Sequence, residues 1–268
     1  MAYFEILVLA IVQGITEFLP ISSSAHLALL HKLNGPSAND IALDVAVHLG
    51  SILAVILYFH ADARRAGAGL VALIRGDRTH PETRLASHLI IATIPIVLAG
   101  AGIVALGLEG ALRDIRIIGW MMIVFGIVLW VVDRRAAQTL TAPQWTARQA
   151  LVMGLWQAVA LIPGVSRSGV SITGARALGY ERHDATRLSM LMSIPTTLCT
   201  GAVLMVDMTK VEAVGPFLAE AAIASVFAFA AAYLALSLMM RFLARVSFTP
   251  YVVYRVILGV ALLAIAYG

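Results

Sequence analysis

The chain has 268 residues, of which 60% are hydrophobic and 13% are charged, and its mean hydropathy is +0.91. A soluble domain has about 25% charged residues, so the composition excludes a soluble globular protein and predicts an integral membrane protein with several spans. The pI near 9.5 comes from an excess of arginine, which cytoplasmic loops explain. The expected partners of these arginines are acidic lipid head groups, and nucleic acid is not expected. The single cysteine, Cys199, excludes an intrachain disulfide.

Six apolar segments have the length of about 20 residues that a membrane-spanning helix needs. Two further apolar stretches are interrupted: 2–30 at Gln13-Gly14 and Pro20, and 150–178 at Pro163-Gly164. Each predicts a re-entrant helix–loop–helix hairpin, which is tolerated at membrane depth only where protein or water surrounds it. The six predicted transmembrane helices are 41–60, 85–108, 115–132, 186–206, 217–241 and 249–267.

The two predicted hairpins resemble each other. Three polar residues recur at one offset of 144 residues: Gln13 and Gln157, Ser22 and Ser166, Ser24 and Ser168. Three spans follow each hairpin, and since three is odd, the second unit must be inverted relative to the first. The sequence therefore predicts an all-α polytopic membrane protein with one domain, 1–268, built as an inverted repeat of about 1–135 and about 148–268. Such repeats place a site near the bilayer midplane, between the two breaks.

Arginine and lysine predict the orientation of the chain. If segment 41–60 runs from outside to inside, 13 of the 19 basic residues fall in inside loops, including those of the basic loop 61–84. The positive-inside rule favours this orientation. Both termini are then external, and the first hairpin enters the membrane from outside. The basic residues expected outside are Lys32, Arg113, Arg116 and Lys210.

The second hairpin, LIPGVSRSGVSITG, holds Arg167 at membrane depth. An arginine there needs an anionic partner or ligand, and its planar guanidinium suits phosphate oxygens. Glycines allow close approach of the backbone to a ligand, and a serine-capped helix start binds anions. The pattern predicts a phosphate-binding cradle whose further members are Gly164, Ser166, Ser168 and Gly169.

The first hairpin, QGITEFLPISSSAH, supplies complementary groups. Glu17 lies four residues after Gln13, on the same helical face, and is a candidate base or ligand of a divalent cation. A serine beside a carboxylate or an imidazole is typical of an activated hydroxyl nucleophile. Together with Arg167 these groups suit phosphoryl chemistry, and the polar residues that follow Glu17 are Ser22, Ser23, Ser24 and His26.

Other interpretations of single residues stay open. The serine run is also a helix-cap pattern, and Glu17 with Arg167 also fits a purely structural ion pair. Asp44 and His48 are interpreted as a polar pair at a helix end, with a supporting role near the site as the alternative. Arg255 is interpreted as an arginine that snorkels to the inner interface. The chain lacks the H-E-x-x-H, Walker A and G-x-S-x-G motifs, which argues against a zinc protease, a P-loop ATPase and an α/β-hydrolase.

Both hairpin stretches resemble the signatures of the BacA/UppP family of undecaprenyl pyrophosphate phosphatases. QGITEFLPISSSAH resembles an [E/Q]-x-x-x-E motif followed by F-L-P and a Ser-Ser-x-x-His block, and PGVSRSG resembles a P-G-x-S-R-S-G motif. The resemblance covers essentially the whole chain. The sequence departs from the family pattern at Ala25, usually glycine, and at Gln13, often glutamate, which leaves one carboxylate for a metal.

The resemblance implies a C55 polyprenyl pyrophosphate substrate, whose terminal phosphate is removed to give the carrier lipid for peptidoglycan synthesis. It also implies bacitracin resistance on overexpression, a divalent cation (Mg²⁺ or Ca²⁺), and a bacterial inner-membrane location with the site open to the external side. By position, Glu17 and Gln13 match the acidic motif, with Glu17 as metal ligand. Ser23 matches the favoured nucleophile, His26 the histidine and Arg167 the essential arginine.

Two other functions remain open from the sequence. A flippase or transporter of polyprenyl phosphate would use the same midplane site, because inverted repeats with broken helices are a transporter design. A structural subunit without chemistry is disfavoured, since intramembrane ionisable groups are functional by default. Attack by Ser23, by His26 or directly by water also stays open, as does a homodimer.

Overall fold

The computed structural model describes residues 3–34, 40–112, 114–208, 218–243 and 245–268, and these ranges are almost entirely helical. Arg113 and Lys210, two of the basic residues expected outside, lie outside the described residues. Two short 3₁₀ turns, Ala142–Gln144 and Val159–Leu161, interrupt the helical order. The α-helices are α1 (Tyr3–Phe18), α2 (Ser23–Asn34), α3 (Asp40–Tyr58), α4 (His60–Ile74), α5 (Thr83–Ala105), α6 (Glu109–Leu112), α7 (Ile115–Arg135), α8 (Ala147–Ala158), α9 (Arg167–Ala177), α10 (Arg182–Met208), α11 (Leu218–Leu243) and α12 (Thr249–Tyr267).

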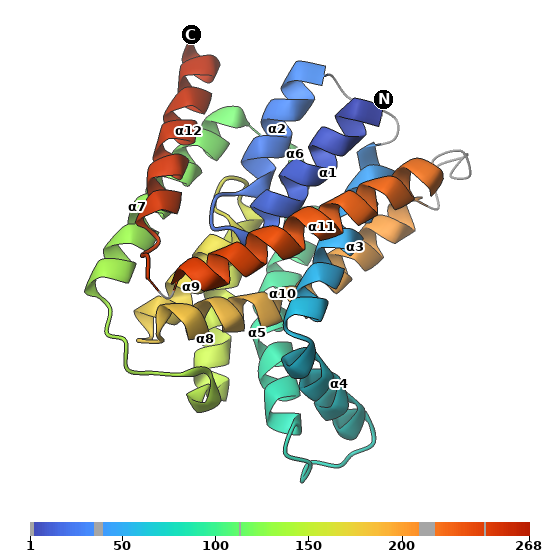
Figure 1. Ribbon diagram of the computed structural model, residues 1–268, viewed down its shortest axis with the longest axis vertical. Helices are drawn as coiled ribbons and strands as arrows, with labels where there is room; N and C mark the ends of the chain where they lie inside the picture. Colours follow the sequence, from blue (N-terminus) through green and yellow to red (C-terminus); the bar gives the residue numbers. More distant parts are fainter. Residues whose placement is uncertain (1–2, 35–39, 113, 209–217, 244) are drawn as a thin grey trace.

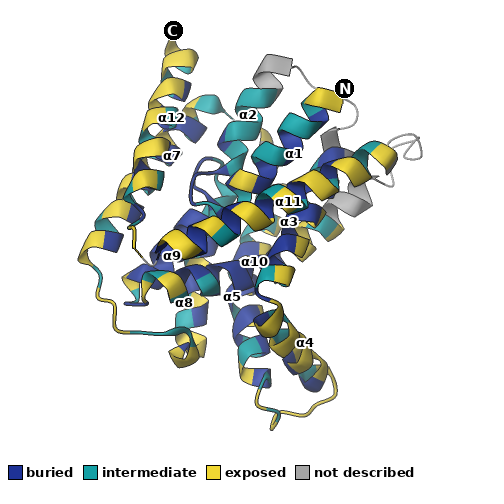
Figure 2. Cartoon of the chain, viewed as in Figure 1, coloured by how far each residue is buried: buried dark blue, intermediate teal, exposed yellow. Residues whose placement is uncertain are grey.

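Four of these helices are long and apolar enough to cross a membrane: α5, α7, residues Ala219–Leu243 of α11, and α12. Their outer surfaces carry exposed large apolar side chains, among them Leu98, Val226 and Ile257, and much of α11 and α12 is exposed in Figure 2. Apolar surfaces of this extent are stable against lipid and not against water. The chain is therefore a multi-pass membrane protein, and four of the predicted spans are confirmed.

The region after α3 differs from the prediction. Residues 61–84 were expected to form a basic loop, but His60–Ile74 is helix α4, bent by 97° from Leu43–Tyr58 of α3. The alanines and arginines of this segment are strong helix formers, and they outweigh its two glycines. The α3–α4 pair would make a fifth span if it counts as one element. The arrangement of six spans and two re-entrant hairpins stays a prediction.

The predicted breaks at Pro20 and at Pro163-Gly164 are present, but the one predicted at Gln13-Gly14 is not, because α1 runs unbroken from Tyr3 to Phe18. Gly14 instead allows α11 to pack closely, since a β-carbon there would lie 2.5 Å from Ala228 O. The first break lies between the end of α1 at Phe18 and the start of α2, and the second between the turn after α8 and the start of α9. Proline ends each helical run because it lacks an amide hydrogen and restricts the preceding residue. Helix α1 packs against α11, and α8 packs against α5. The first helix of each predicted half thus packs against a helix of the other half, which is consistent with two related halves. Their inverted orientation stays a prediction.

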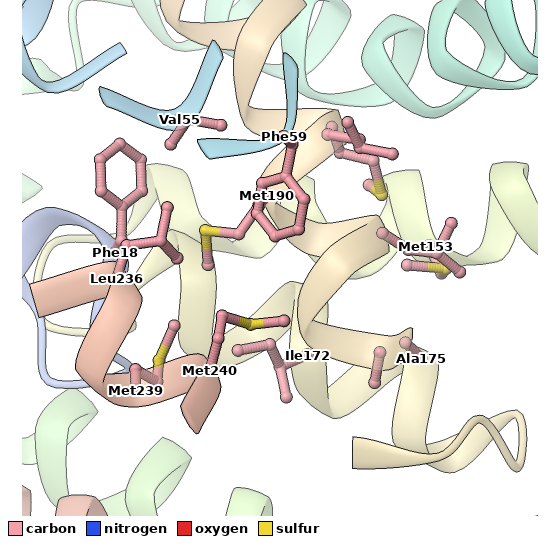
Figure 3. Packing of buried hydrophobic residues seen from close by; sticks show 14 of the residues in the cluster. Phe18, Val55, Phe59, Met153, Ile172, Ala175, Met190, Leu236, Met239 and Met240 are labelled. Atoms are coloured by element: carbon pink, nitrogen blue, oxygen red, sulfur yellow. The ribbon is translucent and has the colours of Figure 1, made fainter. Parts of the chain in front are cut away.

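The start of α1 and the end of α12 lie at one end of the molecule, and α4 lies at the other end (Figure 1). Helices α9 and α10 are the most thoroughly buried part of this view (Figure 2). In the main hydrophobic core, Phe18 of α1 belongs to the same cluster as Ile172 of α9 and Met190 of α10, together with Phe59 and Leu236 (Figure 3). One core therefore supports both breaks and fixes their relative position.

Candidate active site

A buried ion pair joins the two breaks. Glu17 is next to last in α1, and Arg167 is the first residue of α9. Glu17 Oε1 lies 2.7 Å from Arg167 Nη2, and the two side chains are only 10% and 15% exposed. Two charges with so little exposed surface must stabilise each other or a ligand. The structure thus brings together the acid and the guanidinium of the two sequence motifs.

The second carboxylate oxygen of Glu17 accepts two hydrogen bonds. Ser23 Oγ donates to Glu17 Oε2 at 2.9 Å, and Gln13 Nε2 donates to the same oxygen at 2.9 Å. Gln13 precedes Glu17 by one helical turn, and the break folds Ser23 back against it. A hydroxyl within 2.6–3.2 Å of a carboxylate has the geometry of a nucleophile beside its base. Ser23 is the serine of the run that the geometry favours for this role.

Helix α10 holds Arg167 from the other side. Arg167 Nη1 donates to Ser193 O at 3.2 Å and to Thr197 Oγ1 at 2.9 Å. The guanidinium plane is thereby fixed between α1 and α10, which favours bidentate binding of an oxyanion. Ser193 and Thr197 could not be predicted as site residues, because they lie in an apolar span outside any motif.

Glu17 and Arg167 line a cavity of about 210 Å³. At about 30 Å³ per water molecule, this volume has room for roughly seven waters, or for a phosphate group with a few waters. Hydroxyl and guanidinium donors dominate its polar wall, which suits an oxyanion. The lining residues are Glu17, Ser22, Ser23, Ser24, His48, Ile96, Ala160, Leu161, Ser166, Arg167, Thr196, Thr197 and Thr200.

The serines of the two breaks form matching pairs. Ser22 Oγ lies 3.0 Å from Ser24 Oγ, and Ser166 Oγ lies 3.2 Å from Ser168 Oγ. Ser166 is the N-cap of α9, where its hydroxyl accepts a hydrogen bond from the Gly169 amide. The expected serine cap is therefore present and satisfies the Gly169 amide, while the amides of the first two residues of α9 have no intrahelical acceptor.

Hydrogen bonds also tie one break directly to the other. The Gly164 amide donates to Ser24 Oγ at 3.1 Å, and Ser168 Oγ donates to Leu19 O at 2.9 Å. Ser24 lines the cavity, whereas Ser168 faces the first break and is not among the lining residues. The structure therefore brings Ser22, Ser24 and Ser166 to the predicted ligand position, but not Ser168.

The two glycines predicted to approach a ligand instead allow close packing behind the cavity. Gly164 has φ +93°, and a β-carbon there would lie 2.4 Å from Ile118 O. A β-carbon on Gly169 would lie 2.8 Å from Arg255 Nη1. Neither glycine lines the cavity. The requirement for glycine is explained by neighbouring protein atoms, and direct contact with substrate stays a prediction.

His26 lies away from the ion pair. Its Nδ1 lies 2.7 Å from Ser22 O, and its Nε2 lies 2.6 Å from the Tyr254 hydroxyl. The two rings are stacked, with centroids 5.6 Å apart. His26 does not line the cavity, so the structure does not bring its imidazole to Ser23. A part for His26 in the chemistry stays a prediction.

A different histidine, His48, lies in the cavity wall. Its Nδ1 lies 2.7 Å from Asp44 O, one helical turn earlier, and its Nε2 lies 3.4 Å from Gln13 Nε2. The sequence had indicated a helix-end polar pair with a supporting role as the alternative, and the position of His48 favours that alternative. An imidazole inside a predicted span was the available signal.

Arg255 does not snorkel, so that interpretation is wrong. Its side chain is 0% exposed, and it donates to Gly164 O at 3.0 Å and Val165 O at 2.8 Å in the second break. It also donates to Met122 O of α7 at 3.2 Å and to Pro20 O of the first break at 3.5 Å. Among the described residues its recorded partners are carbonyl oxygens and no carboxylate. Arg255 is a positioning residue that holds both breaks from behind the cavity.

A divalent cation would find few protein ligands here. Within the described part of the chain, no three or more His, Cys, Asp and Glu side chains are grouped to hold a metal ion. Mg²⁺ in phosphate sites often binds one or two carboxylates together with substrate oxygens. Gln13 Oε1 is buried with no hydrogen-bond partner among the described residues, on a side chain whose Nε2 contacts the Glu17 carboxylate. These two oxygen donors fit such a site.

Comparison with known proteins agrees with this geometry. Residues 6–261 match the family described as bacitracin resistance protein BacA. Undecaprenyl-diphosphatases of Dinoroseobacter shibae and Ruegeria pomeroyi are each 54% identical over the full length of both chains. Undecaprenyl-diphosphatase 1 of Rhodospirillum rubrum is 43% identical and matches all of this chain and 96% of its own length.

The fold and the cavity define a multi-pass membrane protein with a buried polar site built on two broken helices. The chain belongs to the bacitracin resistance protein BacA family. The resemblance noted in the two sequence motifs is thereby confirmed.

Proposed function

We propose that this chain is an undecaprenyl-diphosphatase. It removes the terminal phosphate of C55 polyprenyl pyrophosphate and yields undecaprenyl phosphate, the carrier lipid of peptidoglycan synthesis, with bacitracin resistance as a consequence. The observation that carries the proposal is the contact of the Glu17 carboxylate with both Ser23 and Arg167 in one cavity. The printed names of the full-length relatives supply the substrate.

In the first step, Ser23 Oγ attacks the terminal phosphorus and its proton passes to Glu17 Oε2, 2.9 Å away. The bond between this phosphorus and the bridging oxygen breaks, and undecaprenyl phosphate leaves. Arg167 stabilises the charge on the transferring phosphoryl group, together with the hydroxyls of the cavity wall. Water then attacks the phosphoserine, which releases phosphate and restores the Ser23 hydroxyl.

A divalent cation, Mg²⁺ or Ca²⁺, would be held by Glu17 and Gln13 through their side-chain oxygens. When bound, it supplies positive charge against the pyrophosphate oxygens. Arg167 complements it from the opposite break, so the substrate anion is neutralised from both hairpins. Gln13 also orients Glu17 through its amide, which donates to Oε2 at 2.9 Å.

For the membrane arrangement we propose six spans and two re-entrant hairpins in the bacterial inner membrane, with the cavity open to the external side. The arginines of α4 and the loop after it lie at the end opposite the start of α1 (Figure 1), as expected for the cytoplasmic end. Single cysteines test this orientation: Arg78→Cys or Tyr267→Cys is introduced into a chain in which Cys199→Ser removes the native cysteine. A membrane-impermeant maleimide should label Tyr267→Cys on intact spheroplasts and Arg78→Cys only after lysis; the reverse pattern contradicts it.

The activity is tested by phosphate release from C55 pyrophosphate in detergent, with Mg²⁺, Ca²⁺ or a chelator. We expect release by the unaltered protein and losses of at least about 100-fold in Glu17→Gln and Arg167→Ala, since each removes a group that contacts the reacting atoms. The exposed Arg148→Gln is the matched control. A flippase would be favoured instead if the protein binds the lipid without releasing phosphate, and if the Ser23→Ala variant moves intact lipid across vesicle membranes.

A further inference from the structure

A second cavity, of about 220 Å³, lies between α4, α5, α10 and the segment Ala142–Trp145. It shares no lining residue with the cavity at Glu17. On α5, His88 of this cavity precedes Ile96 of the other by eight residues, and on α10 Leu191 precedes Thr196 by five. At 1.5 Å per residue these nearest lining residues are about 8–12 Å apart along the helices. The second cavity is therefore a separate feature, at the α4 end of the molecule (Figure 1).

The charges around this cavity do not cancel. Arg187 binds Asp62 through two hydrogen bonds of 2.7 and 2.6 Å, and Arg65 Nε binds Glu82 Oε1 at 2.9 Å. Arg84 donates to Trp145 O at 2.7 Å, and its recorded partners in the described part of the chain are backbone carbonyls. One guanidinium at the cavity thus has no carboxylate partner, and the site has an excess positive charge that favours an anion.

Two buried polar atoms of residues that line this cavity have no hydrogen-bond partner among the described residues. One is the indole Nε1 of Trp145, a side chain that is only 2% exposed, and the other is Glu82 Oε2. Leaving a buried donor or acceptor unsatisfied is unfavourable. A ligand that satisfies both needs an acceptor oxygen for the indole and a donor group for the carboxylate.

The position of α4 indicates where such a ligand comes from. Helix α4 turns 97° away from α3 and exposes Leu70, Val71 and Ile74, the last of them 77% exposed. A helix with these apolar side chains and with arginines in its first turns lies in the membrane interface. A β-carbon on Gly69 would lie 2.1 Å from Glu82 O, so α4 packs directly on the start of α5. The cavity is thus at the level of lipid head groups.

We infer that this cavity binds the head group of a phospholipid. Arg84 and the indole N–H of Trp145 bind the phosphodiester oxygens, and Glu82 Oε2 accepts a hydrogen bond from the hydroxyl or ammonium group beyond the phosphate. Free phosphate offers the same oxygens, but it lacks that second group and the acyl chains that anchor a lipid along α4.

Native mass spectrometry of the full, delipidated chain tests this inference. The protein is titrated with phosphatidylglycerol, phosphatidylethanolamine, diacylglycerol or inorganic phosphate. We expect one phospholipid molecule to bind per chain. Its Kd should be raised about 10-fold or more by Arg84→Gln, which removes a charge-assisted hydrogen bond. Trp145→Phe, which keeps the ring beside His88, should raise the Kd by about 5-fold through loss of a neutral hydrogen bond.

Arg148→Gln removes an exposed arginine and serves as the matched control, with an unchanged Kd expected. Phosphate release by Arg84→Gln should stay close to that of the unaltered protein, because the two cavities are separate. Equal phospholipid affinity in Arg84→Gln and Arg148→Gln would overturn the inference, as would Arg84-dependent binding of inorganic phosphate without bound lipid. If Arg84→Gln does not fold, Trp145→Phe decides alone.

Discussion

Ser22 and Ser166 share a left-handed backbone φ of +73°, at positions 144 residues apart. Within the described residues they are the two non-glycine positions with positive φ. Each hydroxyl binds the serine two residues further on, and both residues line the same cavity. A left-handed conformation is unfavourable by about 1–2 kcal/mol for a residue with a β-carbon. Backbone strain is therefore concentrated in the two breaks, at the wall of the site.

This conformation predicts an unusual order of stability for variants of Ser166. Ser166→Ala keeps the strain and loses the N-cap bond to Gly169, so it should be destabilised by about 1 kcal/mol. Ser166→Gly also loses the hydroxyl, but it releases the strain and should unfold at a higher temperature than the alanine variant. The midpoint of thermal unfolding in detergent measures both.

Ser237 in the interior of α11 is the control. There glycine should be less stable than alanine by about 1 kcal/mol, the usual order in a helix. The same order at Ser166 would contradict a strain at this break.

The contact between Ser23 and Glu17 predicts the nucleophile. Ser23→Ala should lower kcat by at least about 1,000-fold, because the attacking oxygen is absent, while the Kd for the lipid substrate changes little. Ser87→Ala, which loses a hydroxyl on α5 that bonds to Thr83 O, should keep its activity. Trapping of labelled phosphate on Ser23 during turnover provides a second measurement. Retained turnover in Ser23→Ala would point to His26 or to direct attack by water.

Gln13 allows a test of cation binding that does not depend on turnover. Gln13→Glu places a second carboxylate beside Glu17, and the repulsion should lower the unfolding midpoint in a chelator. Mg²⁺ should restore the midpoint, because two carboxylates bind the cation more tightly than one.

Gln157→Glu is the matched control, since Gln157 is equally buried but its amide donates to Ala92 O. It should be destabilised with or without Mg²⁺. If Mg²⁺ raises the midpoints of both variants equally, the cation does not bind at Gln13 and Glu17.

The sequence predicted the parts of the site that carry a local signature. Breaks at proline, a carboxylate and a guanidinium in apolar surroundings are visible in the residues themselves, and their pairing follows from the cost of isolated charge. The roles of Arg255 and of α10 were not visible. The partners of Arg255 are backbone carbonyls, which leave no mark in a sequence, and Thr197 resembles any small polar residue of a span. The helix α4 was missed because its arginines were attributed to topology alone.

Arg255 provides the last prediction. Its planar guanidinium reaches carbonyls of α7 and of both breaks, which the single ammonium of a lysine cannot do. Arg255→Lys should therefore let the breaks shift relative to each other. A misplacement of about 1 Å can lower a rate by about 100-fold, so we expect a fall of 10-fold to 100-fold in kcat, with a smaller change in KM.

Arg176 separates positioning of the site from stability alone. It is also fully buried, but it binds Asp133 and carbonyl oxygens that include those of Ala137 and Tyr180, away from the breaks. Arg176→Lys and Arg255→Lys should both lower the unfolding midpoint, since each leaves buried acceptors unsatisfied. Only Arg255→Lys should lower kcat in the folded fraction, measured by phosphate release well below both midpoints. Equal losses of kcat in the two variants would reduce Arg255 to a structural residue.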